Sequence, residues 1–204
     1  MQTLVFYSSK GGGGKTTLCV HAAVAASATG SVAVLDCDPQ GSSMAWAGAR
    51  QAAAPVVVPC SPGRIREGIE AARDDGHVYC FVDAPPHALG AARDLLAAAD
   101  LVVIPVRPSV LDLAALPQAA ALVVQSGRPA VLVLSAARPR QAELEEVRRA
   151  LETGYPWLVL ETAIHDRLAF ARALASGQAV SEFEPTGAAA REIKQLWREL
   201  RAQL

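Results

Sequence analysis

The chain of 204 residues is long enough for one domain, or for one domain with a small appendage, and we expect a single domain over residues 1–204. Hydrophobic residues make up 51% of it and charged residues 19%, a balance that supports a buried core and excludes general disorder. The formal net charge of −1 excludes attraction of nucleic acid through overall charge, so any affinity for DNA has to come from a local patch.

In chain order, short apolar runs alternate with helical patterns. The runs predict strands over residues 4–7, 32–35, 56–58, 78–82, 101–106, 131–134 and 157–160. Helices are predicted over residues 18–30, around Trp46, over 64–73, 91–98, 111–125 and 141–151, and twice more before the C-terminus, with a kink or restart at Pro117. The alternation indicates an α/β fold, a single doubly wound, mostly parallel sheet with helices on both faces. The carboxyl ends of its strands meet at one edge, where ligands of such sheets bind.

The N-terminus enters the first predicted strand without a basic segment or an apolar signal core, so we expect no secretory leader. The most apolar run, around residues 114–124, is broken by Pro117 and Gln118 and is too short to span a membrane. The four cysteines form no C-x-x-C pair: Cys19, Cys37, Cys60 and Cys80. We therefore expect a cytoplasmic chain with reduced, mostly buried thiols.

A glycine-rich loop follows the first predicted strand and precedes a helical pattern. It reads Lys-Gly-Gly-Gly-Gly-Lys-Thr-Thr over residues 10–17. Glycines without Cβ let backbone N–H groups turn toward a polyphosphate, and the following helix directs its positive end at the same anion. Lys15 then reaches the β- and γ-phosphates, and the Thr16 hydroxyl is placed to ligate Mg²⁺. The residues expected to bind the nucleotide are Gly11, Gly12, Gly13, Gly14, Lys15, Thr16 and Thr17.

The loop departs from the ordinary phosphate-loop pattern at its first letter. Ser9 stands where that pattern has glycine, and Lys10 directly precedes the glycines. The chain has only three lysines, and two of them, Lys10 and Lys15, are in this loop. The arrangement resembles the deviant Walker A ATPases, the group containing ParA and MinD, whose pattern is K-G-G-x-G-K-[ST]. The resemblance implies that Lys10 crosses a dimer interface and contacts the phosphates held by the other subunit.

Two acidic turns follow predicted strands, one at residues 36–40 and one at residues 83–86. The second, Asp-Ala-Pro-Pro, is similar to the family's D-x-P-P, and Asp83 ends its strand where a Walker B aspartate is expected to hold Mg²⁺. The first, Asp-Cys-Asp-Pro-Gln, is similar to the family's D-x-D-P-Q, which implies that Asp38 positions the attacking water. Taken alone, each motif could also be an ordinary turn, because Asp and Pro commonly end strands.

The resemblance extends over essentially the whole chain. Residues 108–113 are similar to a P-S-x-L-D-x stretch of short plasmid-partition ParA proteins such as ParF, and residues 162–182 are similar to that family's C-terminal third. Larger ParA proteins carry an N-terminal DNA-reading domain, and we expect none here, since Met1 lies directly before the first strand. Nitrogenase-type iron proteins need cluster-binding cysteines after the Walker B strand, and no cysteine follows Cys80.

The last predicted helix has three faces. Its apolar residues are Ile193, Leu196, Trp197, Leu200 and Leu204, and its acidic and amide residues are Glu192, Gln195 and Glu199. Its basic residues are Arg191, Lys194, Arg198 and Arg201. We expect the apolar face to pack on the domain rather than on a membrane. The basic stripe has two interpretations, a sequence-independent DNA contact and a solvated face partly balanced by acids four residues away.

The expected adenine-binding region and the four histidines belong to none of these motifs. Adenine recognition is expected from loops after the later strands, near Arg138 or around residues 180–183, without assignment to single residues. The histidines are expected to be packing or surface residues: His21, His77, His87 and His165. Among them, His87 lies in the expected switch segment after Pro86.

The resemblance implies a Mg²⁺-dependent ATPase, weak and stimulated by a partner, that dimerises around ATP. It implies a dimer that binds DNA non-specifically on the nucleoid and partitions plasmid or chromosomal DNA with a ParB-like adaptor. One alternative is the positioning of a protein cargo, such as a chemoreceptor cluster or microcompartment, by the same cycle. Further alternatives are a MinD-like regulator that cycles on a membrane and a binding module that does not hydrolyse its nucleotide.

Overall fold

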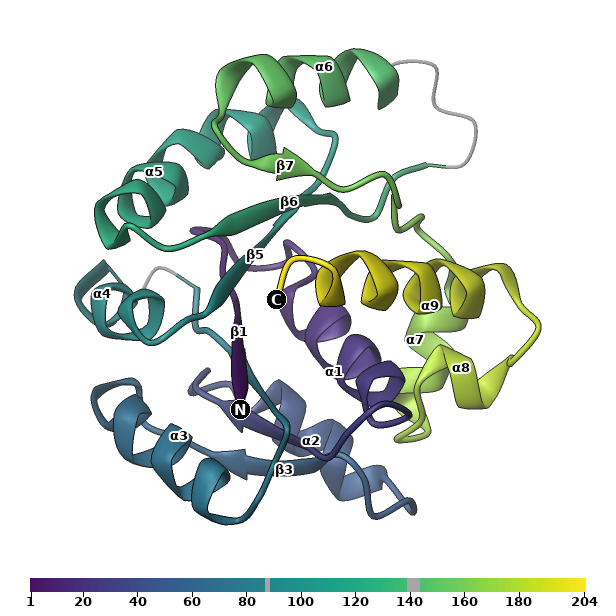
Figure 1. Cartoon of the computed structure of the whole chain (residues 1–204). Coiled ribbons are helices and arrows are strands. Elements are labelled where there is room, and N and C mark those ends of the chain that lie inside the picture. The colour runs from purple at the N-terminus through teal and green to yellow at the C-terminus, as the bar shows by residue number, and fades with distance from the viewer. Residues whose placement is uncertain (87–88, 139–143) are drawn as a thin grey trace.

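The computed structural model describes residues 1–86, 89–138 and 144–204 (Figure 1). Within them, seven strands form one sheet in the order β3-β2-β4-β1-β5-β6-β7, and every neighbouring pair is parallel. The strands are β1 (Gln2–Phe6), β2 (Val32–Asp36), β3 (Val56–Pro59), β4 (Tyr79–Asp83), β5 (Leu101–Val106), β6 (Ala130–Leu134) and β7 (Leu158–Val159). This arrangement confirms the predicted doubly wound α/β fold.

Helices cover both faces of the sheet (Figure 1). The first group comprises α3 (Ile65–Asp74), which follows a short 3₁₀ turn (Pro62–Arg64), α4 (Leu89–Ala97), α5 (Val110–Ser126) and α6 (Leu144–Gly154). The second comprises α1 (Lys15–Ala26), α7 (Leu168–Ala175), α8 (Val180–Phe183) and α9 (Ala188–Arg201), while α2 (Ser42–Ala49) packs beside β3 and α7. Each group shares a separate hydrophobic cluster with the sheet.

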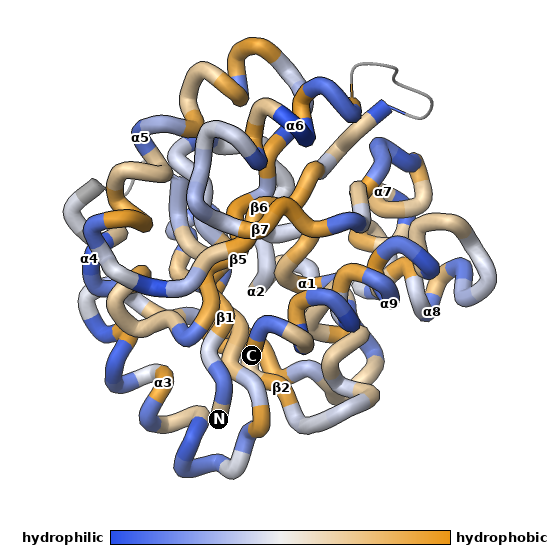
Figure 2. The backbone as a smooth tube through the Cα atoms, turned by 45° about the horizontal axis from the view of Figure 1, so that its top comes forward, coloured by the Kyte–Doolittle hydropathy of each residue, from blue (hydrophilic) through white to orange (hydrophobic). Residues whose placement is uncertain are grey.

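The strands are apolar on both sides because each side faces a layer of helices. In β4, Cys80 and Val82 belong to the cluster of the first group, whereas Phe81 belongs to the cluster of the second. All five residues of β2 and of β4 are buried. Figure 2 shows the result, with hydrophobic colour along the strands and hydrophilic colour mostly on the outer helices.

The register of the central strands brings the phosphate loop and both acidic turns to one edge. Phe6, the last residue of β1, is paired with Asp83 of β4, which is paired in turn with Asp36 of β2. The Cys37 N–H also donates to the Asp83 carbonyl oxygen at 3.0 Å. The loop that starts after β1 and the turns after β2 and β4 therefore meet at the carboxyl ends of adjacent strands, as predicted.

The helices differ from the prediction in two places. Three helices, α7, α8 and α9, precede the C-terminus where two were predicted. α5 runs through Pro117 as one helix, so of the predicted kink or restart the restart is wrong. Pro117 is exposed, so its ring lies at the surface of the helix rather than in the core. Residues 141–143 of the helix predicted from 141 lie outside the described residues, as does His87.

The apolar face of α9 packs on the domain, as predicted. Ile193, Leu196 and Leu200 are fully buried and belong to the cluster that α1 shares with the sheet. The Trp197 indole N–H donates to the Thr29 hydroxyl at 3.2 Å. Among the described residues, no helix combines the length and the apolar character that a membrane crossing requires.

Candidate functional site

The phosphate loop has the backbone conformation for which its glycines are needed. Gly12 and Gly14 have φ values of +76° and +92°, in the left-handed region that residues with a Cβ rarely adopt. Gly14 immediately precedes Lys15, the first residue of α1, so the positive end of this helix faces the loop. A Cβ at Gly13 would lie 3.0 Å from the Ser8 Oγ, so a side chain there would crowd the base of the loop.

Lys15 is folded into the loop. Its side chain is buried, and the Nζ atom donates to the Ser8 hydroxyl at 3.3 Å and to the Lys10 carbonyl oxygen at 3.0 Å. Burial lowers the pKa of Lys15, while the nearby carboxylates of Asp83 and Asp38 partly offset this effect. The loop thus holds an ammonium group at its own base, where a loop that binds a polyphosphate needs positive charge.

Lys10 points away from the loop, toward the start of α5. Its Nζ atom donates to the Leu111 carbonyl oxygen at 2.6 Å. Leu111 and its neighbour Val110 are 73% and 83% exposed, the largest exposures among the large hydrophobic residues of the described chain. The lysine therefore contacts an exposed apolar turn of its own chain.

Asp83 lies at the end of β4, completely buried. The Ser43 hydroxyl donates to its Oδ2 atom at 2.7 Å, and the Oδ1 atom has no hydrogen-bond partner among the described residues. Burial raises the pKa of Asp83 to about 6, although the Ser43 and Thr16 hydroxyls lower it in part. A buried carboxylate with one unpaired oxygen is suited to bind a cation.

The two aspartates of the first acidic turn have different surroundings. The Asp36 carboxylate is buried and accepts from the backbone N–H groups of Asp38, at 3.1 Å, and Met44, at 2.8 Å. Asp38 is half-buried, and its Oδ1 atom accepts from the Gln40 N–H at 2.9 Å. Asp36 thus holds the turn against α2, while Asp38 keeps an oxygen available for other partners.

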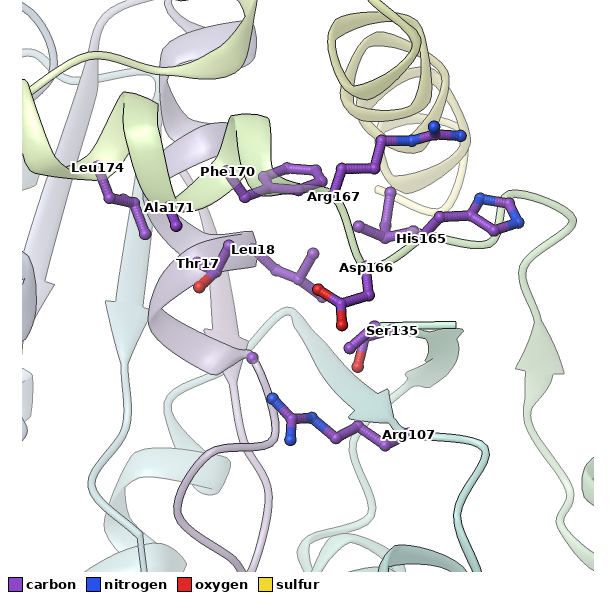
Figure 3. A pocket seen from close by; sticks show the side chains of 13 residues that line it. Thr17, Leu18, Arg107, Ser135, His165, Asp166, Arg167, Phe170, Ala171 and Leu174 are labelled. Atoms are coloured by element: carbon purple, nitrogen blue, oxygen red, sulfur yellow. The ribbon is translucent and has the colours of Figure 1, made fainter. Parts of the chain in front are cut away.

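A pocket of about 210 Å³ opens beside the loop, next to Gly14 and Thr17 (Figure 3). The other lining residues are Leu18, Arg107, Ser135, Ala136, Ile164, His165, Asp166, Arg167, Phe170, Ala171 and Leu174. Of the two regions expected for adenine, residues 180–183 do not line this pocket, whereas the loop near Arg138 does so through Ser135 and Ala136, although Arg138 itself does not. Val180 is instead fully buried, and its N–H donates to the His21 Nδ1 atom at 3.1 Å.

Sequence reasoning missed two serines that support the site. Ser43 is bonded to Asp83, and the Ser135 hydroxyl donates to the Gly13 carbonyl oxygen at 3.0 Å. Both bonds join residues far apart in the chain, and neither serine belongs to a motif. The position of Ser135 directly after an apolar strand, at the edge where ligands bind, is the one signal that could have drawn attention to it.

The basic stripe of α9 is exposed along its length. Three of its members, Lys194, Arg198 and Arg201, line one hollow of about 370 Å³ between α1, α8 and α9. The acids of this helix have partners elsewhere. Glu192 accepts from the Arg167 guanidinium at 2.6 Å, and Glu199 accepts from the Thr162 hydroxyl at 2.5 Å. Glu192 and Glu199 therefore tie α9 to the segment before α7.

Within residues 1–86, 89–138 and 144–204, the remaining candidates form no second centre. In the part of the chain that the structure describes, no group of three or more His, Cys, Asp or Glu residues could hold a metal ion. All four cysteines are free, and Cys60 alone among them is not fully buried. The predicted burial of most thiols is thus confirmed.

Comparisons with known proteins agree with this geometry. Residues 4–180 match the model of the CobQ/CobB/MinD/ParA nucleotide binding domain. The chain is 31% identical over 208 residues to "Maintenance of carboxysome distribution protein A" of Halothiobacillus neapolitanus, covering 97% of this chain and 95% of the relative. It is similar in structure to the ATP complex of a Cyanothece McdA variant, with a TM-score of 0.78 and 18% identity; the match covers 100% of this chain and 96% of the McdA chain. It is also similar to the Mg-ADP complex of Pyrococcus horikoshii MinD, with a TM-score of 0.82 and 14% identity; this match covers 98% of this chain and 95% of the MinD chain.

Proposed function

The chain belongs to the CobQ/CobB/MinD/ParA family of nucleotide-binding domains, and on this premise we propose that it is an ATPase switch that positions a cargo by cycling between a monomer and an ATP-bound dimer. The observation that carries the ATPase part is the buried Asp83, whose unpaired oxygen lies at the same sheet edge as the loop that holds Lys15. The nucleotide is ATP and the cation is Mg²⁺, the ligands with which the solved relatives were obtained.

The loop residues bind the phosphates. Backbone N–H groups of residues 11–14 surround them, with the hydroxyl groups of Thr16 and Thr17 at the start of α1. Lys15 exchanges its bonds to the Ser8 hydroxyl and the Lys10 carbonyl for phosphate oxygens. Burial lowers the pKa of Lys15, and the negatively charged phosphate oxygens stabilise the charged form of its ammonium group.

Asp83 and the Thr16 hydroxyl hold the cation. Mg²⁺ at this place supplies electrostatic stabilisation of the charge that develops on the transferred phosphoryl group. Asp38 orients the attacking water through the carboxylate oxygen that its turn leaves available. Ser43 keeps the Asp83 carboxylate in one orientation through its hydrogen bond to Oδ2.

Lys10 makes dimerisation depend on the nucleotide. In the single chain its ammonium group is bonded to the Leu111 carbonyl oxygen. When ATP is bound in a second copy, the lysine leaves this carbonyl and contacts the partner's phosphates, where a charge-assisted bond is stronger than a bond to a neutral acceptor. Loss of the γ-phosphate on hydrolysis then weakens the pair, and an adaptor protein that stimulates the slow turnover sets its lifetime.

The cargo that we favour is a protein microcompartment. The Halothiobacillus relative, which matches nearly the full length of the chain, is named for the maintenance of carboxysome distribution. DNA of the nucleoid serves as the track, bound non-specifically through the basic stripe of α9 in each subunit. A second candidate cargo is plasmid or chromosomal DNA held by a ParB-like adaptor, favoured by the P-S-x-L-D-x stretch at residues 108–113.

Two assays test the proposal. The first measures ATP turnover of the wild type and of Lys15→Ala, with and without non-specific DNA and the candidate adaptor. The second measures sedimentation with ATP in the presence of non-specific DNA or of vesicles of anionic phospholipid. We expect the adaptor to raise turnover above the Lys15→Ala level. We expect the protein to sediment with DNA but not with vesicles. Turnover equal to that of Lys15→Ala contradicts the ATPase role, and sedimentation with vesicles contradicts the DNA track.

A further inference from the structure

Arg107 lies beside the phosphate loop and belongs to none of the recognised motifs. It directly follows β5, whose Val106 carbonyl oxygen accepts from the Ser135 N–H at 2.9 Å. The Ser135 hydroxyl in turn bonds to the Gly13 carbonyl oxygen at 3.0 Å. Two hydrogen bonds therefore connect the backbone before Arg107 to the loop. Figure 3 shows its side chain extending from the sheet edge toward the loop that leads into α1.

The side chain of Arg107 is exposed and lines the pocket together with Gly14 and Thr17. Among the described residues, it takes part in none of the ion pairs. Asp166 lines the same pocket, also outside those ion pairs, and points into it from the segment before α7 (Figure 3). Within the described chain, the pocket thus has an unpaired cation on the side of the loop and an unpaired anion on the opposite wall.

We propose that Arg107 binds the α-phosphate of the nucleotide, an inference that rests on the proposed ATPase function. Lys15 and the carboxylates of Asp38 and Asp83 define the part of the loop where the terminal phosphates lie. The pocket opens on the other flank, at Gly14 and Thr17, and its apolar wall of Ile164 and Phe170 suits the nucleoside. The phosphate nearest to this pocket is the α-phosphate.

The chemistry of the two charged residues agrees with this orientation. The planar guanidinium group of Arg107 offers a pair of N–H donors that match two phosphate oxygens. Asp166 repels phosphate and accepts hydrogen bonds from the hydroxyl or amino groups of the nucleoside. Since Arg107 is already solvated and outside the ion pairs of the described chain, none of those pairs has to break when the nucleotide binds.

An α-phosphate contact gives a specific signature, because ATP and ADP share this group. We expect Arg107→Gln to weaken the affinities for ATP and for ADP by the same factor, about tenfold for the removal of a charge-assisted hydrogen bond. Arg107→Lys keeps the charge but not the planar pair of donors, so its affinities should lie between those of the wild type and those of Arg107→Gln. The KM for ATP should rise with Arg107→Gln while kcat stays unchanged, because charge develops at the γ-phosphate.

Isothermal titration calorimetry with unlabelled ATP and ADP measures these affinities, and Arg149→Gln is the matched control. Arg149 is also an exposed arginine, but it lies on α6 and does not line the pocket, so its replacement should leave both affinities unchanged. Equal affinities of Arg107→Gln and the wild type, or a weaker affinity for ATP alone, overturn the inference. A wild type that binds neither nucleotide overturns the proposed function and this inference with it.

Discussion

The Lys10 ammonium nitrogen lies 2.6 Å from the Leu111 carbonyl oxygen of the same chain. This bond joins the first residue of the phosphate-loop motif to the first turn of α5, where Val110 and Leu111 are strongly exposed. In the proposed cycle, the second copy that draws Lys10 away has to approach the same turn. The bond therefore marks both the resting position of the lysine and a part of the expected dimer surface.

Leu111→Asp should weaken the ATP-dependent dimer. A carboxylate at this exposed apolar position has to lose water when the partner approaches, and we expect a decrease in dimer affinity of at least about tenfold. Val124→Asp is the control, because Val124 is 59% exposed near the other end of the same helix. Sedimentation equilibrium with ATP measures the effect, in an Asp38→Ala background that we expect to stop turnover. A dimer weakened equally by both substitutions would mean that this turn lies outside the interface.

Asp83→Asn should make the chain more stable and unresponsive to Mg²⁺. Because burial raises the pKa of Asp83 from 3.8 to about 6, the ionised carboxylate destabilises the folded state above pH 6. The amide removes this charge, and we expect a gain of about 2 kcal/mol in the free energy of unfolding at neutral pH. Urea unfolding measures this gain, and thermal melts with ATP, with and without Mg²⁺, measure the metal response. A destabilised variant that keeps the Mg²⁺ response would contradict the assignment.

His21 should make stability fall in mild acid. Its side chain is fully buried, and burial lowers its pKa from 6.5 to about 3, so in this window the unfolded chain binds a proton that the folded chain does not. The free energy of unfolding then decreases by up to about 1.4 kcal/mol for each unit by which the pH falls. In His21→Asn, the amide oxygen can still accept from the Val180 N–H but does not titrate.

Urea unfolding of both proteins across this pH window checks the His21 prediction. The contribution of Asp83, which has the opposite sign between pH 3.8 and about 6, cancels in the difference between wild type and His21→Asn. We expect the wild type to lose stability relative to the variant as the pH falls. Parallel profiles would show that His21 takes up no proton on unfolding.

Reversal of charge on α9 should weaken DNA binding in a salt-dependent way. The double variant of Lys194→Glu and Arg198→Glu should reduce the slope of log affinity against log salt by about 0.9 for each DNA phosphate that the protein no longer neutralises. The double variant of Arg66→Glu and Arg73→Glu makes the same charge change on α3, at the other face of the sheet. Fluorescence anisotropy with a labelled duplex and ATP measures both. An equal decrease in affinity for the two variants would indicate an effect of net charge rather than of the stripe.

Most of the fold follows from local patterns in the sequence. Continuous apolar strands alternating with helices predict the parallel sheet, and the loop before α1 and the turns ending β2 and β4 predict the edge where the candidate site lies. Each of these signals is contained within a few neighbouring residues. The restart predicted at Pro117 failed because an exposed helix position tolerates one missing hydrogen bond when the rest of the helix packs on the core.

The supporting interactions of the candidate site could not be predicted, since each joins residues distant in the chain. Lys10 is bonded to Leu111 and Ser43 is bonded to Asp83. Asp166 lines the pocket beside the phosphate loop, although it lies far from that loop in the sequence. No motif includes Ser43 or Asp166. Only the folded chain shows which polar side chains beyond the motifs face the loop.

Sedimentation velocity of the wild type, Lys10→Ala and Lys15→Ala, with Mg²⁺ and saturating ATP or ADP, shows whether Lys10 couples nucleotide binding to dimerisation. We expect the wild type to be a dimer with ATP and a monomer with ADP. Lys10→Ala should bind ATP yet remain monomeric, and Lys15→Ala should lose nucleotide affinity as well. A Lys10→Ala protein that dimerises with ATP as readily as the wild type, or a wild type that stays monomeric at saturating ATP, would contradict this coupling.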